Sequence, residues 1–188
     1  MKAKDKADSL VIAKVRQGDI EAFGKVVDKY QPILYQLAYK ILLNREDALD
    51  SVQDAFVLAY RALEQYDIER PFYLWLYKIA YNAAIKTYNR RKVTKNMLHL
   101  DDLENPENLI VSKDNPTTNL LSEEIQAVVK QGVAKLSPDY RAVFVLRVQE
   151  ELSYKDIASI LSIPIGTVMS RLARAREQLQ NFLTPILK

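Results

Sequence analysis

Apolar residues recur at helical spacing along most of this chain, and the pattern breaks only in its middle. Positions three or four residues apart fall on one side of a helix, at about 100° per residue. Helices are predicted over 10–17, 20–42, 45–64, 71–92, 123–135 and 138–150, with two short ones within 152–180. Only four glycines and seven prolines occur in 188 residues, which leaves few of the turns that a sandwich or barrel needs. We therefore predict an all-α fold.

Residues 152–180 have the pattern of two short helices joined by a tight turn. Ser153 and Asp156 are spaced as a capping box at the start of the first helix. Pro164 ends that helix after Ser162, because proline lacks a backbone donor and disfavours helical geometry in the residue before it. The apolar stripe of the second helix predicts which side faces the core: Val168, Leu172, Ala175 and Leu179.

A separate face of that second helix is polar and basic. It carries Thr167, Ser170, Arg171 and Arg174. A helix in the major groove of DNA uses arginine to bond guanine edges, and serine or threonine to bond bases or phosphates. The alternative is an ordinary amphipathic helix hairpin with solvated arginines, which the spacing alone does not exclude.

Composition narrows the class of protein. Cysteine is absent and the one histidine, His99, stands in a polar stretch, so we expect no disulfide, metal centre or cofactor. The first ten residues lack the apolar core of a signal peptide, and no apolar run approaches the length of a membrane span. We expect a cytoplasmic protein that does not insert into the membrane.

Charge is distributed unevenly along the chain. Residues 99–124 contain seven acidic side chains and one lysine, a net charge of −6. Because the whole chain carries +3, the remainder carries +9, which is typical of a protein that binds a polyanion. The same stretch has two prolines and no sustained helical period. We predict two small helical domains, residues 1–95 and 123–188, joined by a flexible acidic linker over 96–122.

The predicted helix 45–64 has an acidic face. Asp47, Asp50 and Asp54 follow one another at helical spacing, with Gln53 beside them. No histidine or further carboxylate motif accompanies them, so a metal site is disfavoured. A solvated helix face and a docking surface for a basic partner both remain open.

The predicted helix 71–92 has an apolar stripe and, beside it, a polar face and a row of tyrosines. The polar face carries Lys78, Asn82, Lys86, Asn89 and Arg90, and the tyrosine row consists of Tyr77, Tyr81 and Tyr88. Aromatic rings among cations suit single-stranded nucleic acid, whose bases stack on the rings. Packing in the core is the alternative for the tyrosines.

Three stretches resemble the sigma factors of bacterial RNA polymerase, of the extracytoplasmic-function (ECF) type. They are DALDSVQDAFVLAYRAL (47–63), RPFYLWLYKIAYNAAIKTYNRRKV (70–93) and LSYKDIASILSIPIGTVMSRLARAREQL (152–179). They occur in the order and at the spacing of that family, and the resemblance covers nearly the whole chain. It implies a promoter-specificity subunit without enzymatic activity, built from a region 2 domain and a region 4 domain.

The resemblance also implies roles for individual residues. In region 2, Asp50, Gln53 and Asp54 would dock on the β′ coiled coil of core RNA polymerase. The -10 element would be read and melted by the helix 71–92, with Asn82 on an extruded base and the loop 65–72 as its pocket. The -10 residues would be Phe72, Lys78, Asn82, Lys86, Arg90 and Arg91. The -35 element would meet Arg147, Thr167, Ser170, Arg171 and Arg174.

The implied partners are core polymerase, including its β flap, promoter DNA and a separate anti-sigma factor that could hold the protein at the membrane. The acidic linker would thread the RNA-exit path of the polymerase. Met169 departs from the family pattern, because family members usually have lysine or arginine there. Two rival interpretations are a stand-alone helix-turn-helix regulator and a recombinase, although a recombinase would need a catalytic cluster that the sequence does not offer.

Overall fold

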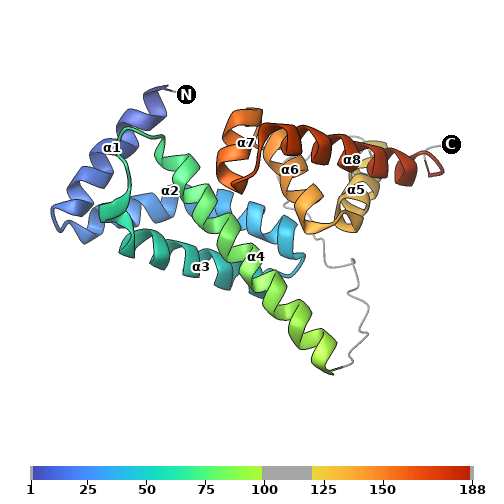
Figure 1. Cartoon of the computed structure of the whole chain (residues 1–188), viewed down its shortest axis with the longest axis horizontal. Helices are drawn as coiled ribbons and strands as arrows, with labels where there is room; N and C mark the ends of the chain where they lie inside the picture. Colours follow the sequence, from blue (N-terminus) through green and yellow to red (C-terminus); the bar gives the residue numbers. More distant parts are fainter. Residues whose placement is uncertain (1, 99–119, 187–188) are drawn as a thin grey trace.

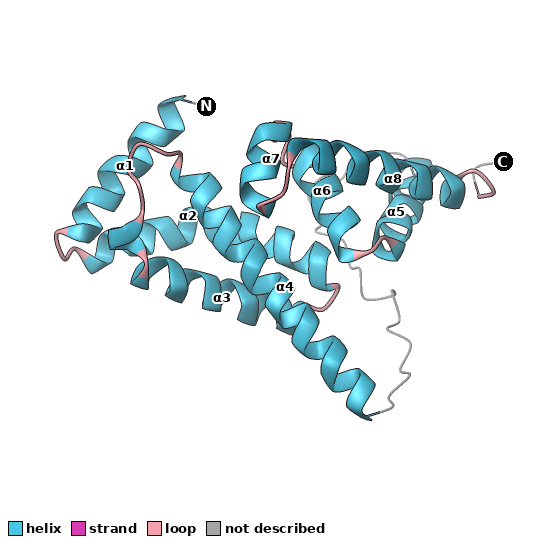
Figure 2. Ribbon diagram, in the orientation of Figure 1, coloured by secondary structure: helices cyan, strands magenta, loops and turns pink. Residues whose placement is uncertain are grey.

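A computed structural model describes residues 2–98 and 120–186, and within these ranges every regular element is helical (Figure 2). The N-terminal half consists of the four long helices α1 to α4 and a short 3-10 turn. Their bounds are α1 Lys2–Arg16, α2 Ile20–Leu42, α3 Arg45–Arg61, η1 Leu63–Gln65 and α4 Phe72–Leu98. The C-terminal half consists of α5 Leu120–Lys135, α6 Pro138–Val148, α7 Tyr154–Leu161 and α8 Ile165–Leu183. The predicted all-α fold is confirmed.

Side-chain caps begin the helices α2, α3, α6 and α7. Asn44 accepts a hydrogen bond of 3.0 Å from the amide of Asp47 and begins α3. Ser153 accepts one of 3.1 Å from the amide of Asp156 and begins α7. At the end of α7, Ser162 adopts a left-handed conformation with φ 56°, and the chain turns there. The predicted cap at Ser153 and the stop signal are confirmed, and the Asp156 carboxylate accepts a hydrogen bond of 2.7 Å from the Ser153 hydroxyl.

Several helix bounds differ from the prediction. The first helix is longer than 10–17, since α1 begins at Lys2. The predicted helix 45–64 ends at Arg61 and continues as the 3-10 turn η1. The helices α4 and α5 extend to Leu98 and back to Leu120, so both ends of the predicted linker are helical. The remainder of that linker lies outside the described residues.

The predicted apolar stripes form the core. In α3 the buried positions include Ala48, Val52, Ala55, Phe56 and Ala59, and in α8 they are Val168, Leu172, Ala175 and Leu179. The helix α2 runs through the N-terminal half and continues through Pro32. Burial of these stripes is the main stabilising contribution, at about 25 cal/mol for each Å² of apolar surface removed from water.

The two halves share this core. The helix α6 packs against α2, and α7 packs against α4, so residues more than 70 positions apart in the chain are in contact (Figure 1). Figure 1 also shows that the C-terminal part of α4 projects beyond the body of the protein. One apolar cluster runs from Ile12 in α1 to Leu172 in α8.

Arg141 is the main polar link between the halves. Its side chain is only 5% exposed. It donates hydrogen bonds of 3.1 and 2.8 Å to the carbonyls of Lys40 and Ile41, at the end of α2. It also donates two of 2.7 Å to the carbonyls of Ala134 and Leu136, at the end of α5. The last carbonyls of a helix have no partner within the helix, so one guanidinium satisfies two helix ends.

Candidate nucleic-acid interface

The helices α7 and α8 meet at an angle of 100° across a break of three residues, Ser162, Ile163 and Pro164. This is the geometry of a helix-turn-helix motif, in which the second helix enters the major groove of DNA. The backbone amides of Thr167 and Val168 donate to the carbonyl of Pro164 and close the first turn of α8. The predicted helix-turn-helix is therefore present, with α8 in the position of the recognition helix.

Only part of the polar face predicted for α8 is exposed. Ser170 and Arg174 are exposed, and the Arg174 side chain keeps 67% of its surface open to solvent. Arg174 lies 3.0 Å from Glu177 in an exposed pair, a type of contact that contributes little to stability. Thr167 is half-buried, and its carbonyl accepts a hydrogen bond of 3.1 Å from the hydroxyl of Ser170.

Arg171 is held inside the C-terminal half. Its guanidinium lies 3.1 Å from the carboxylate of Asp139 at the start of α6, and its side chain is 24% exposed. Tyr81 of α4 lies close to this pair: burial, and then the charge of Asp139, raise the pKa of its phenol. The arrangement indicates that Arg171 fixes α8 against α6, whereas Arg174 pairs with exposed Glu177 of its own helix and stays accessible from solvent.

Arg147 is also engaged within the fold. It donates a hydrogen bond of 2.9 Å to the carbonyl of Leu152, and its guanidinium stacks on the ring of Tyr154 at 5.2 Å from the centroid. These contacts fix the turn that leads into α7. Its predicted contact with DNA stays a prediction.

The cationic face of α4 is open to solvent as predicted from its polarity. Lys78, Asn82, Lys86 and Arg90 are all exposed. Arg91 lies apart from them, since it pairs with Asp47 of α3 at 2.8 Å and is half-buried. The structure thus brings four of the six predicted -10 residues to the surface of α4.

The aromatic residues of α4 lie in the core. Phe72 is 1% exposed and packs edge-on against Tyr30 and Tyr66, so its side chain cannot touch DNA in this conformation. Tyr77 and Tyr81 are 5% and 8% exposed. Their burial against the C-terminal half, near Glu150 and Asp139, favours the packing alternative over a stacking platform. Only Tyr88 of the predicted row is even partly exposed.

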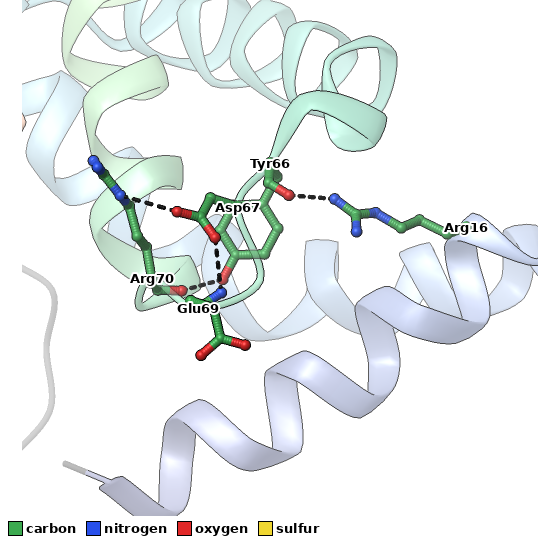
Figure 3. Close-up of polar contacts among 5 residues, drawn as sticks. All are labelled: Arg16, Tyr66, Asp67, Glu69 and Arg70. Atoms are coloured by element: carbon green, nitrogen blue, oxygen red, sulfur yellow. Dashed lines mark hydrogen bonds and ion pairs between the residues drawn. The ribbon is translucent and has the colours of Figure 1, made fainter.

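The loop between η1 and α4 has a fixed shape (Figure 3). Arg16 of α1 donates to the carbonyls of Leu63 and Tyr66, and the Tyr66 hydroxyl donates to the carbonyl of Arg70. Asp67 accepts a hydrogen bond of 3.1 Å from the amide of Glu69. These contacts hold both ends of the loop, while Asp67, Glu69 and Arg70 remain exposed.

The acidic face of α3 is exposed and is bordered by apolar side chains. Asp50, Gln53 and Asp54 are open to solvent, and so are Leu49 and Val57, at 41% and 48%. Asp47 does not belong to this face, because it pairs with Arg91. A surface of this kind suits a partner helix with both basic and apolar residues.

The sequence did not reveal the residues that join the halves. The hydroxyl of Tyr77 donates a hydrogen bond of 2.8 Å to the carboxylate of Glu150, and the ammonium of Lys40 donates to the side chain of Gln149. Burial, and then the charge of Glu150, raise the pKa of Tyr77 far above its ordinary value. The one available signal was Arg141, a cation directly before the apolar run 142–146.

The described part of the chain offers neither a cluster of metal ligands nor a single membrane-spanning helix. Among residues 8–94 and 127–186, whose side chains the structure describes, no group of histidine, cysteine, aspartate or glutamate is placed to hold a metal ion. Over the same ranges no single helix has the length and apolar character to cross a membrane, and α7 with α8 would do so only as a pair across their bend.

Comparison with known proteins agrees with this arrangement. Residues 26–94 match the Sigma-70 region 2 family, and residues 127–179 match the Sigma-70 region 4 family. The chain is 36% identical to the ECF RNA polymerase sigma-E factor of Haemophilus influenzae, over 98% of this chain and 100% of that protein. It is also 36% identical to the ECF RNA polymerase sigma factor SigW of Bacillus subtilis, over 92% and 94% of the two chains.

Two solved structures are similar over nearly their whole length. CnrH in complex with the cytosolic domain of CnrY has a TM-score of 0.68 and 26% identity, covering 95% of this chain and 98% of that one. The sigma factor RpoE in complex with the anti-sigma factor NepR from Bartonella quintana has a TM-score of 0.69 and 25% identity, covering 88% and 98%. With the helix-turn-helix and the region 2 helices, these matches show that the chain belongs to the ECF family of RNA polymerase sigma factors.

Proposed function

We propose that this ECF sigma factor reads a promoter through two separate surfaces and carries out no bond chemistry itself. Residues 1–95 act as the unit for the -10 element, and residues 123–188 act as the unit for the -35 element. The observation that carries the proposal is the pairing, in one chain, of an open recognition helix with the exposed cationic face of α4. A stand-alone helix-turn-helix regulator is not favoured, because residues 26–94 match sigma region 2.

At the -35 element, Ser170 and Arg174 make the polar contacts of α8. Arginine bonds guanine in a bidentate way, and serine bonds either a base or a phosphate. Thr167 lies at the edge of this surface. Arg171 and Arg147 act mainly by holding α8 and α7 in place, since both are engaged within the C-terminal half.

At the -10 element, Asn82 contacts an extruded base while Lys78, Lys86 and Arg90 meet phosphates. All four side chains are exposed on α4. The loop 65–72 receives the extruded base, and the contacts of Arg16 and Tyr66 keep it preformed. Capturing a base offsets an unpairing cost of a few kcal/mol. Phe72 supports this loop from the core instead of touching DNA.

The face of α3 formed by Asp50, Gln53 and Asp54 docks on the coiled coil of the polymerase β′ subunit. The exposed apolar residues Leu49 and Val57 border it and add contact area. The acidic charge sets the rate of encounter and the orientation with a basic partner. We further propose contact of the C-terminal half with the β flap.

The two halves separate when the promoter is bound. Elements named for positions -35 and -10 are roughly 25 base pairs apart, which is about 85 Å along the helix axis at 3.4 Å per base pair. In this structure α7 packs against α4, and packed helices lie about 8–10 Å apart. The compact arrangement therefore represents the protein before it engages DNA.

A separate anti-sigma factor is the proposed regulator, and the protein acts in the cytoplasm. Both similar solved structures are complexes, and one is titled as a complex with the anti-sigma factor NepR. Tethering at the membrane through such a partner is part of the same proposal.

Run-off transcription with purified core polymerase tests the function. We expect promoter-dependent transcripts from a genomic library only when this chain is added, and the absence of any such transcript would overturn the proposal. The variant Asp50→Lys with Asp54→Lys should no longer co-purify with core polymerase. The matched control is Asp28→Lys with Glu64→Lys, the same charge change at exposed positions away from that face.

A further inference from the structure

The exposed side of α8 contains an apolar row as well as a polar one. Met169 is 53% exposed, and Ala173 is exposed one helical turn further on. Gly166 precedes Met169 by three residues and is exposed too. Ser170 and Arg174 run parallel to this row, one position later in each turn. The outward face thus presents carbon on one edge and hydrogen-bonding groups on the other.

Packing within the protein does not account for the apolar row. The core stripe of α8 lies on the opposite side, at Val168, Leu172 and Ala175. Neither Met169 nor Ala173 belongs to the apolar core of the described residues. A scattered exposed apolar side chain is common on protein surfaces. Here, however, the row occupies the N-terminal part of a recognition helix, the part that meets base edges in a helix-turn-helix complex.

The major groove offers one apolar group to such a surface. Each base pair presents donors and acceptors there, and only thymine adds a methyl group at C5. An arginine at position 169 would instead seek a guanine edge or a phosphate. We propose that Met169 and Ala173 read thymine methyl groups in the -35 element, beside the bases or phosphates bonded by Ser170 and Arg174. This inference rests on the proposed function and names the base preference of the same site.

The size of the effect follows from the apolar surface that leaves water when one thymine methyl group is buried. Burying one such group changes a binding constant about fourfold. Each thymine contacted by the row should therefore contribute a factor of about four to the affinity for the upstream element. The polar row sets orientation, because its hydrogen bonds are directional.

Replacement of thymine by deoxyuridine tests the inference directly, since it removes only the C5 methyl group and preserves base pairing. Holoenzyme made from core polymerase and the full chain is used to select tight-binding duplexes from a random pool. Each thymine of the upstream element is then replaced singly, and dissociation constants are measured by competition. We expect about fourfold weaker binding at one or two positions. With the Met169→Ala variant, the loss of affinity at one of these thymine positions should become smaller and approach no change.

A matched control is Val148→Ala, which shortens another exposed apolar side chain, 48% exposed, at the end of α6. It should keep the full sensitivity to deoxyuridine. Thermal unfolding confirms that each variant is folded. Binding that ignores every deoxyuridine replacement, or a sensitivity that Met169→Ala and Ala173→Ser both leave unchanged, would overturn the inference while leaving the sigma function intact. Failure of the holoenzyme to select any duplex would overturn the proposed function itself.

Discussion

The guanidinium of Arg171 lies 3.1 Å from the carboxylate of Asp139, so the recognition helix is fastened to the start of α6 by one of its own arginines. Arg174, one turn further along α8, has 67% of its side-chain surface exposed. Helical spacing puts Arg171 and Arg174 on one face, but the two side chains have different surroundings. Arg171 holds the helix, and Arg174 is open to solvent.

Substituting each arginine by alanine should separate the two roles. We expect Arg174→Ala to weaken binding of holoenzyme to the upstream element by 1–3 kcal/mol, about 5- to 150-fold, with unchanged thermal unfolding. Arg171→Ala should lower the stability by up to about 1 kcal/mol, because a half-exposed ion pair is lost. Competition binding and thermal unfolding measure the two effects. Equal losses of affinity at unchanged stability would contradict the assignment.

Gly166 gives a second test of the recognition surface. A methyl group added at this position would meet no atom of the protein within 4 Å. Gly166→Ala should therefore raise the stability by up to about 1 kcal/mol, since glycine is unfavourable in a helix. The same methyl group would stand between α8 and the floor of the groove, so we expect several-fold weaker binding to the upstream element.

The control for this change is Gly24→Ala, because Gly24 of α2 also has open space around it and lies outside the helix-turn-helix. Its stability should rise in the same way while DNA affinity stays constant. If both variants bind DNA like the parent protein, the expectation that α8 lies close to the floor of the groove at Gly166 is wrong.

The helices and their buried faces could be predicted from the sequence because both depend on local periodicity and caps. The stripe of α8 and the cap at Ser153 are examples. The contacts between the halves could not be predicted. Arg141 and Ile41 are 100 positions apart, and no local pattern relates them. Helical spacing places Arg171 and Arg174 on one face. Only Asp139, in another helix, makes one of them half-buried and leaves the other exposed, so spacing alone could not separate them.

The same limit explains the aromatic residues of α4. Spacing assigns Tyr77 and Tyr81 to a row beside the apolar stripe, but it does not say what covers that row. In the structure the C-terminal half covers it, with Glu150 bonded to Tyr77 and Asp139 close to Tyr81, and both rings are buried. Phe72 differs, because the apolar stripe of the helix 71–92 predicts its burial. Spacing could not supply its partners Tyr30 and Tyr66, which come from α2 and from the loop after η1.

Arg141 should be critical for stability. Replacing it by methionine keeps much of the volume but leaves carbonyls at the ends of α2 and α5 without their donor. We expect Arg141→Met to lower the free energy of unfolding by about 3–5 kcal/mol, since several buried acceptors lose a charged partner at once. Urea denaturation measures the change. Arg176→Met, at an exposed position of α8, should cost less than about 0.5 kcal/mol. Similar midpoints for the two variants would refute the role of Arg141 as the link.

Tyr77 gives the link between the halves a pH dependence. Its hydroxyl donates to Glu150 at 2.8 Å, and burial followed by the charge of Glu150 raises its pKa far above the ordinary value. An unfolded tyrosine loses its proton near pH 10. Above that pH the unfolded state binds fewer protons than the folded state, so stability falls as pH rises. Below about pH 10 the contribution is fully present.

Phenylalanine at position 77 removes both the hydrogen bond and this proton. We expect Tyr77→Phe to lower the stability at pH 8 by about 1–2 kcal/mol, because a hydrogen bond to a carboxylate is lost. Between pH 10 and pH 11 its stability should fall less steeply than that of the parent protein, by up to about 1.4 kcal/mol per pH unit, the value for one proton. Urea denaturation at each pH measures the slope. Tyr60→Phe, at a position that is 43% exposed, controls for loss of a phenol outside the contact between the halves. Parallel slopes for the parent protein and Tyr77→Phe would show that the proton of Tyr77 is not linked to folding.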